Sequence, residues 1–248
     1  MHDATLSSRH RLSVGWARHG DEVREAQRLR FDVFAREFGA QLPTSVPLHD
    51  VDRYDDFCEH LLVRDGESGQ VIGTYRALTP SQARRAGSSY ADSEFDLTPL
   101  APLRPRMLEL GRSCVHPAHR HGRVMLVLWS ALAEFMTEHD LDTMMGCASV
   151  PLHADPSAAA GVWNRLRQTH LSAPHCRIAP RRPLPLPGDG QLRSLDVEPP
   201  ALVNSYLRLG ARVLGPPAWD PTFNCADLPL LVRMEDLPAR YRRAVANA

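Results

Sequence analysis

The residues with the clearest chemical potential lie in one run, 107–132, which reads M-L-E-L-G-R-S-C-V-H-P-A-H-R-H-G-R-V-M-L-V-L-W-S-A-L. A predicted strand, 108–115, is followed by a short basic loop and a strongly apolar helix, 123–139. Loop amides and a helix N-terminus bind anions, and arginine strengthens such a site. We therefore predict a phosphate site here, with an ordinary strand–loop–helix connection as the alternative. Its residues are Arg120, His121, Gly122, Arg123 and Val124.

Composition limits the functions that this site can serve. The chain has 248 residues, is 43% hydrophobic and 23% charged, and has zero net charge, which argues against nucleic-acid partners. Its five cysteines form no C-x-x-C pair, so we predict neither a metal site nor a disulfide framework. All 29 basic residues are arginine, which excludes Schiff-base chemistry on lysine. The absence of an apolar leader or span predicts a cytoplasmic protein.

The surrounding pattern predicts an α/β fold. Residues 1–20 are expected to be a polar arm and 21–248 one domain, with a proline- and arginine-rich excursion at about 171–198 that is either an ordered surface segment or a mobile loop. Strands alternate with helices, which favours a mixed sheet. The predicted helices are 21–38, part of 81–100, 123–139, 158–170 and 200–209, and the predicted strands are 60–64, 70–78, 108–115, 143–150, 212–214 and 228–234.

The strand, basic glycine loop and helix resemble the signature of the GNAT acyltransferase superfamily. The resemblance implies a splayed central sheet, a loop that holds the phosphate of an acyl carrier, and a preceding strand (here Ser113, Cys114 and Val115) along the pantetheine arm. His119 and Val124 depart from the coenzyme A pattern, and a β-branched Val124 would crowd a second phosphate, which favours acyl carrier protein. S-Y-L-R-L-G-A-R-V resembles the segment whose tyrosine, here Tyr206, protonates the leaving thiolate; a packed tyrosine is the alternative.

A closer resemblance covers nearly the whole chain. R-L-R-F-D-V-F, D-V-D-R-Y-D, G-T-Y-R-A-L and E-L-G-R-S follow in the order found in acyl-homoserine lactone synthases. D-D-F-C-E-H-L-L-V, E-L-G-R-S-C-V-H-P and W-D-P-T-F-N-C-A-D resemble the ornithine-acyl carrier protein N-acyltransferases still more. Asn204-Ser205 replaces the Lys-Gly that is frequent in that family.

The resemblance implies attack of an amine on a thioester. Glu109 is the candidate base, with Gly111 on the same strand face leaving room for substrate; a structural Glu109–Arg112 pair is the alternative. Asp52 and Asp55 are expected either to bind the amine of ornithine or, as in the lactone synthases, to form an ion network with arginines. Amides after Arg112 are candidates for holding the thioester oxygen, and Cys114 and Cys147 are expected to pack in the core. The catalytic set is Glu109, Arg112 and Tyr206, and the substrate set is Arg30, Phe34, Asp52, Asp55 and Arg76.

The sequence thus predicts transfer of a (3-hydroxy)fatty acyl group from acyl carrier protein to the α-amine of ornithine. No permanent cofactor is expected, because acyl-phosphopantetheine acts as co-substrate. The basic segment 177–182 suggests contact with an acidic carrier protein or with the inner face of a membrane. Three alternatives stay open: another amino acid as acceptor, an acetyl-CoA-dependent N-acetyltransferase, and a non-catalytic acyl-carrier-binding protein.

Overall fold

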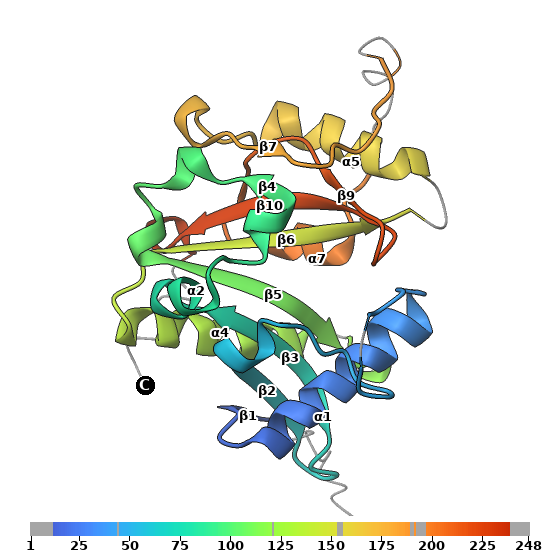
Figure 1. The fold of residues 1–248 in the computed structure, drawn as a ribbon, viewed down its shortest axis with the longest axis vertical. Coiled ribbons are helices and arrows are strands. Elements are labelled where there is room, and N and C mark those ends of the chain that lie inside the picture. Colours follow the sequence, from blue (N-terminus) through green and yellow to red (C-terminus); the bar gives the residue numbers. More distant parts are fainter. Residues whose placement is uncertain are drawn as a thin grey trace, which may run out of the picture.

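A mixed sheet organises the molecule (Figure 1). The computed structural model describes residues 12–43, 45–120, 122–152, 156–188, 191 and 197–238. The strand order is β1-β2-β3-β5-β6-β10-β8, with β9 paired to β10. The strands are β1 Leu12–Trp16, β2 Glu59–Asp65, β3 Val71–Leu78, β5 Met107–Val115, β6 Thr143–Pro151, β8 Arg212–Val213, β9 Ala218–Asp220 and β10 Cys225–Arg233. A separate two-stranded sheet joins β4 (Phe95–Asp96) to β7 (Ala179–Pro180).

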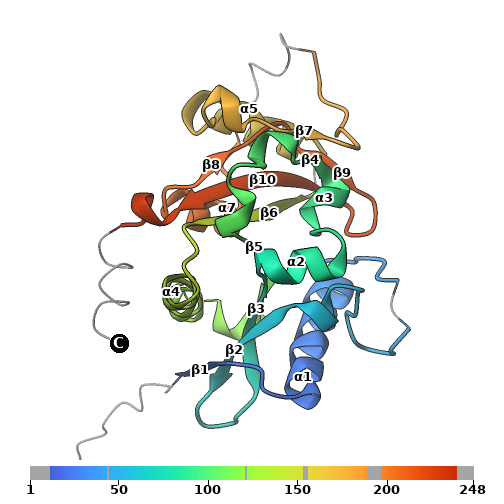
Figure 2. The same cartoon turned by 60° about the vertical axis from the view of Figure 1, so that its left-hand side comes forward.

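Helices lie on both faces of the sheet. They are α1 Gly20–Phe31, α2 Pro80–Ala86, α3 Ala91–Glu94, α4 Arg123–Glu138, α5 Pro156–Thr169 and α7 Ala201–Leu207, and α1 continues as a π-helix, Asp32–Glu37. Figure 2 shows α4 on one face of β1–β3, with α1 and α2 on the other. The apolar side of α4 approaches β3 closely at Gly73, where the absence of a side chain makes room. A Cβ added to Gly73 would lie only 2.4 Å from Val124 Cγ1. This packing fixes the loop before α4 relative to β3 and β5.

The sheet opens between β5 and β6, its one parallel pair of strands in the described part of the chain. Their pairing runs from Met107 opposite Thr143 to Leu110 opposite Gly146, although both strands continue beyond these residues. The pairing of β3 with β5 shifts register between Thr74 and Arg76, where β5 holds an extra residue. Such a bulge bends a strand and ends regular pairing. The predicted splayed, mixed α/β sheet is therefore confirmed.

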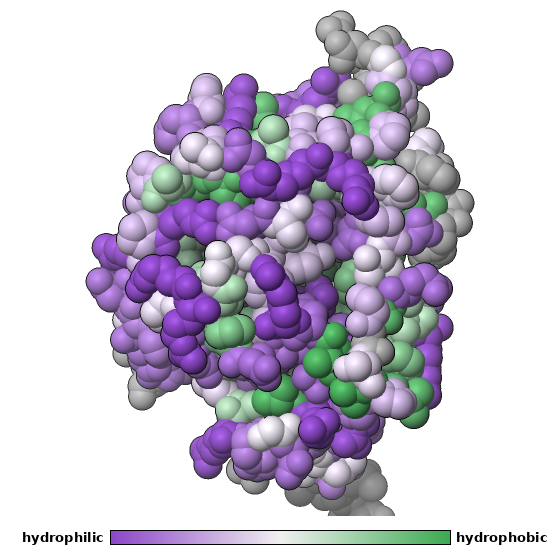
Figure 3. Space-filling model, in the orientation of Figure 1, coloured by the Kyte–Doolittle hydropathy of each residue, from purple (hydrophilic) through white to green (hydrophobic). Residues whose placement is uncertain are grey.

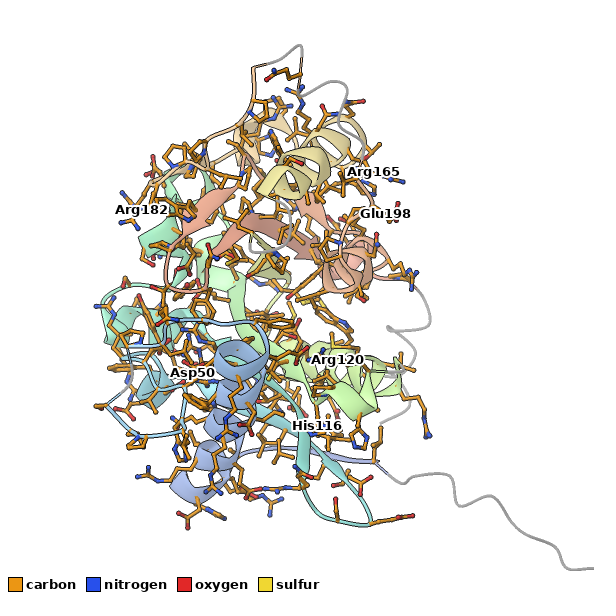
Figure 4. All side chains as sticks on the ribbon, turned by 90° about the vertical axis from the view of Figure 1, so that its right-hand side faces the viewer. Asp50, His116, Arg120, Arg165, Arg182 and Glu198 are labelled. Atoms are coloured by element: carbon orange, nitrogen blue, oxygen red, sulfur yellow. The ribbon has the colours of Figure 1, made fainter. Side chains whose placement is uncertain are left out.

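Most predicted elements are present, but the predicted N-terminal arm is too long. Strand β1 (Leu12–Trp16) pairs with β2 and so belongs to the domain, whereas residues 1–11 lie outside the described residues. A five-residue edge strand with a largely exposed face shows little alternation, so its pattern resembles a polar arm. The excursion is anchored where it is described, by β7 on β4 and by a bridge from Pro183 to Ala218. An ion pair of 2.7 Å joins Arg165 of α5 to Glu198 (Figure 4).

Candidate active site

A cavity of about 880 Å³ occupies the opening between β5 and β6. It reaches from the end of the π-helix, past both strands, to α7 and the loop after β9. One part is apolar and the other carries charged groups; the apolar lining includes Val33, Phe34, Phe38, Val115, Met125, Leu126, Trp129 and Leu202. Figure 3 shows apolar surface beside the C-terminal end of β5. The cavity brings together predicted catalytic, substrate-binding and carrier-binding residues.

Three arginines and three aspartates form a closed ring beside the cavity. Arg30 donates to Asp50 at 2.8 Å and to Asp55 at 2.9 Å. Arg76 of β3 binds Asp52 at 2.6 Å and Asp55 at 2.9 Å. Arg112 of β5 closes the ring with bonds of 3.0 Å to Asp50 and 2.9 Å to Asp52. Each arginine bridges two aspartates and each aspartate bridges two arginines, so the ring is neutral.

The ring fixes the loop 48–57 against α1, β3 and β5; Figure 4 shows Asp50 beside α1. Burial works to raise the pKa of Asp55, but the charges and hydrogen bonds of Arg30 and Arg76 outweigh it and hold that pKa well below its usual value. The pKa of Asp52 is lowered in the same way, with burial opposed by Arg76 and Arg112. The predicted ion network is therefore present. Sequence reasoning missed Asp50, although it lies in the same acidic stretch, H-D-V-D-R-Y-D.

Arg112 is the extra residue of the bulge in β5, with a φ of 53° that is unusual outside glycine. Its guanidinium lies 4.7 Å from the ring centroid of Phe223 and 5.1 Å from that of Tyr90. Phe34 packs edge-on against Phe223 at 5.5 Å and lines the cavity. Since Arg112 pairs with aspartates, the alternative prediction of a structural Glu109–Arg112 pair is wrong.

Glu109 lies in the cavity wall, on the strand side that includes Gly111. Its two carboxylate oxygens accept hydrogen bonds from the backbone N–H groups of Tyr90 (2.8 Å) and Ala91 (2.9 Å), at the start of α3. Burial raises the pKa of Glu109 above its usual value, although these amides and Ser89 work in the opposite direction. A Cβ on Gly111 would meet nothing within 4 Å. The site thus holds a more basic carboxylate beside open space.

Tyr206 of α7 lies where β5 and β6 separate. Its hydroxyl is 2.8 Å from that of Tyr75 on β3, and a Cβ on Gly146 would lie 3.4 Å from it. Its ring packs edge-on against Trp129 at 4.9 Å. Burial raises the pKa of Tyr206 well above its usual value and that of Tyr75 to about 12, and a hydrogen bond with Ser113 lowers the latter. Tyr206 therefore holds its proton near neutral pH, within reach of the cavity.

The loop before α4 leads directly into the helix, as the sequence predicts, and its role as an anion site stays a prediction. Gly122 has a φ of 91° and caps α4. Arg120, beside the first turn of α4 in Figure 4, donates to the Val115 carbonyl at 3.0 Å and pairs with Glu37 at 2.5 Å. Arg123 is exposed, and His121 lies outside the described residues.

Two further predictions concern side chains near this loop. Val124 packs against Gly73 in the core and also lines the cavity, and its crowding of a second phosphate stays a prediction. Cys114 is buried among apolar residues, and burial raises its pKa to about 12. Burial also raises the pKa of Cys147 well above its usual value, although this residue lines the cavity. Neither thiol is activated as a nucleophile.

The charged end of the cavity contains a group that sequence reasoning missed. Asp220, Cys225 and Asp227 come from β9 and β10, and their side-chain ligand atoms lie within 4.8 Å of one another. Asp227 accepts from Ser149 of β6 at 2.6 Å and from Cys225 at 3.3 Å. Their one signal is their place in W-D-P-T-F-N-C-A-D, a phrase that carries the family resemblance without assigning a role.

Known proteins with similar sequences identify the family. The family model described as Acetyltransferase (GNAT) domain matches residues 29–130. The L-ornithine N(alpha)-acyltransferase of Rhodobacter capsulatus is 35% identical over 240 residues, which are 91% of this chain and 91% of that protein. That of Brucella abortus is 35% identical over 93% of this chain and 87% of that protein. The chain belongs to the L-ornithine N(alpha)-acyltransferase family.

Solved structures confirm the fold. A CoA-dependent acyl-homoserine lactone synthase, solved with SAM and isopentyl-CoA, has a TM-score of 0.55 at 19% identity, over 90% of this chain and 82% of that one. The GNAT-like fold is thus established, and the acyltransferase class follows from the sequence relatives. None of the described helices is long and apolar enough to cross a membrane.

Proposed function

We propose that this acyltransferase moves a fatty acyl group from acyl carrier protein to the α-amine of ornithine, giving lyso-ornithine lipid. The observation that carries the proposal is the cavity at the opening between β5 and β6, which Glu109 and Tyr206 both line. Glu109 suits the role of general base for the attacking amine, and Tyr206 suits the role of general acid for the leaving thiolate. The four curated relatives, all named L-ornithine N(alpha)-acyltransferase, support ornithine as acceptor.

The proposed reaction is direct transfer. The α-ammonium gives a proton to Glu109, directly or through water, Glu109 passes this proton to solvent, and the resulting amine attacks the thioester carbonyl. The C–N bond forms and the C–S bond breaks, while the second amine proton leaves through the same base. The departing thiolate takes a proton from Tyr206, whose hydrogen bond to Tyr75 at 2.8 Å offers a source for its replacement. Atoms and charges then balance as amide, thiol and one released proton.

The oxyanion of the tetrahedral intermediate needs hydrogen-bond donors at the opening between β5 and β6. Beyond Leu110 the edge of β5 no longer pairs with β6, so it faces the cavity. Backbone N–H groups near Ser113 to Val115 are the proposed donors, and the same edge would accompany the pantetheine arm. The neutral ring of Arg30, Arg76 and Arg112 with its aspartates would keep this strand in place without holding substrate through Asp52 or Asp55.

The acyl chain and its carrier are assigned from the apolar wall and the loop before α4. The apolar half of the cavity suits a long chain, whereas the 3-hydroxyl group follows only from the family resemblance. Gly122 and the first amides of α4 would bind the carrier's phosphate. The exposed arginines Arg177, Arg181 and Arg182 suit an acidic carrier protein, or contact with the inner face of a membrane where the lipid product would go.

The test is a product analysis by mass spectrometry. Purified protein is incubated with 3-hydroxypalmitoyl carrier protein and an equimolar pool of amino acids, and parallel reactions use palmitoyl-CoA or acetyl-CoA. N-acyl ornithine made from the carrier-protein thioester, and lost in Glu109→Gln, is the expected result. Another N-acyl amino acid would refute ornithine, and turnover of a CoA donor alone would refute the carrier. No product from any donor would leave a binding protein.

A further inference from the structure

Two acidic regions lie in or beside the cavity, and they differ in how their charge is balanced. In the ring, Asp50, Asp52 and Asp55 are matched by three arginines. In the cavity wall, Asp220 and Asp227 are 4% and 3% exposed, and neither forms an ion pair with any described residue. Burial, with the nearby charge of Asp220, raises the pKa of Asp227, and hydrogen bonds from Ser149 and Cys225 and the more distant Arg112 only partly oppose this rise. A buried carboxylate of this kind gains stability when a cation enters beside it.

The hydrogen bonds at Asp227 leave one side of its carboxylate open. Ser149 and Cys225 both donate to Oδ1. No hydrogen bond joins Oδ2 to a side chain or amide in the described part of the chain, and Asp227 lines the cavity. Asp220 is already oriented: its Oδ1 accepts from the N–H groups of Thr222 and Phe223, and its Oδ2 accepts from the Tyr90 hydroxyl at 3.0 Å. The pair thus presents an oriented acceptor, Asp227 Oδ2, to whatever occupies the cavity.

Tyr90 relates this acceptor to the proposed base. Its backbone N–H donates to Glu109 and its hydroxyl donates to Asp220, so the two carboxylates are one tyrosine side chain apart. That separation suits an amino acid with one amine at Glu109 and a second at the end of an extended side chain. The Arg112 guanidinium lies over the Tyr90 ring, 5.1 Å from its centroid. Arg112 Nε and Nη2 donate hydrogen bonds to Asp50 and Asp52 of the ion-pair ring. Its Nη1 makes no hydrogen bond to a described residue, so it can bind an α-carboxylate.

We propose that Asp227, supported by Asp220, binds the side-chain ammonium of the amino-acid substrate. This inference rests on the proposed function and deepens it, because it says how the enzyme selects a diamino acid. With the α-carboxylate at Arg112 and the side-chain ammonium at Asp227, only the α-amine reaches Glu109. The same contacts therefore account for acylation at the α position in place of the side-chain amine. An amino acid without the second amine loses a charge-assisted hydrogen bond in a dry site.

The test compares ornithine with norvaline, which has the same carbon chain without the side-chain amine. Binding of each is measured by titration calorimetry, and turnover by mass spectrometry of product, for wild type, Asp227→Asn and Asp140→Asn. Asp140 lies on the surface, and asparagine suits its φ of 53°, so the last variant is a matched control. Melting temperatures show whether each variant is folded. Calorimetry reports on the inference even if no donor supports turnover.

Wild type and Asp140→Asn should bind ornithine more tightly than norvaline by roughly 10- to 100-fold. In Asp227→Asn, ornithine affinity should fall by about that factor, whereas norvaline binding should change less than about threefold. Equal binding of both amino acids by wild type, or an unchanged preference in Asp227→Asn, would overturn the inference and leave amino-acid acylation intact. Loss of ornithine binding on addition of a chelator would point instead to a metal ion on Asp220, Cys225 and Asp227.

Discussion

Replacing Asp55 by asparagine removes one charge from the ring and leaves its shape almost unchanged. Asp55 accepts from Arg30, Arg76 and Gln27, and its side chain is 3% exposed. The change leaves a buried excess of one positive charge and turns an amide N–H₂ toward a guanidinium. Removing one partner of a buried ion network costs about 3–5 kcal/mol. We expect Asp55→Asn to lose about that much free energy of unfolding, a large fraction of the ~5–15 kcal/mol typical of a domain.

The control is the same substitution at Asp32, which pairs with Arg36 across one helical turn. Both side chains of that pair are more than half exposed, so Asp32→Asn should cost no more than about 1 kcal/mol. Urea denaturation followed by circular dichroism gives both free energies of unfolding. At ~2–4 °C per kcal/mol, the melting temperature of Asp55→Asn should fall by about 6–20 °C. Losses for the two variants within 1 kcal/mol of each other would refute the view that the ring is a buried, coupled unit.

Acid provides a second test of the same reasoning. The pKa of Asp55 is lower in the folded protein than in the unfolded chain, where it is about 3.9. Its ionised form therefore stabilises the fold fully above the unfolded pKa, and this stability is lost as the pH falls toward the folded pKa. The difference in stability between wild type and Asp55→Asn should be constant from about pH 7 to 5 and shrink below about pH 4. A difference that grows in acid would contradict the assigned direction.

Three predictions concern the reacting groups. Glu109→Gln should lower kcat by about 10²- to 10⁴-fold and remove the acid limb of the pH–rate profile, which in wild type should lie above the usual range for glutamate because the pKa of Glu109 is raised. Tyr206→Phe should lower kcat by about 10²-fold and Tyr75→Phe by less, as measured in single-turnover assays; a larger loss for Tyr75→Phe would reverse their roles. Gly146→Ala would place a Cβ 2.9 Å from the Leu110 carbonyl oxygen, at the opening between β5 and β6. The KM for the acyl donor should therefore rise, while the KM for ornithine stays near the wild-type value. Unchanged donor kinetics would mean that this opening is not the donor site.

Local pattern determined most of the elements. Periodic apolar residues predicted α1 and α4, and alternating or continuous apolar runs predicted β2, β3, β5 and β6 within a residue or two. The phrase E-L-G-R-S-C-V-H-P and the acidic stretch before β2 carried the family resemblance and hence most of the candidate site. Strand β1 was assigned to the polar arm, and the short strands β4, β7 and β9 were not predicted, since a short strand depends on its partner for its hydrogen bonds more than on its own alternation.

Tertiary structure decided which charges meet. The sequence contains 29 acidic and 29 basic residues, and their spacing along the chain does not show which of them pair. It could not show that Asp50 completes the ring, or that Arg112 pairs with Asp50 and not with Glu109. Tyr75 and Tyr206 are 131 residues apart in the sequence, and they share a hydrogen bond because β3 and α7 come together at the opening between β5 and β6. Asp227 faces Ser149 through the antiparallel register of β10 with β6, and Asp220 lies opposite Cys225 through the register of β9 with β10. Electrostatic and hydrogen-bond partners are set by distance in space, which the fold alone fixes, whereas helices and strands are set by neighbours along the chain.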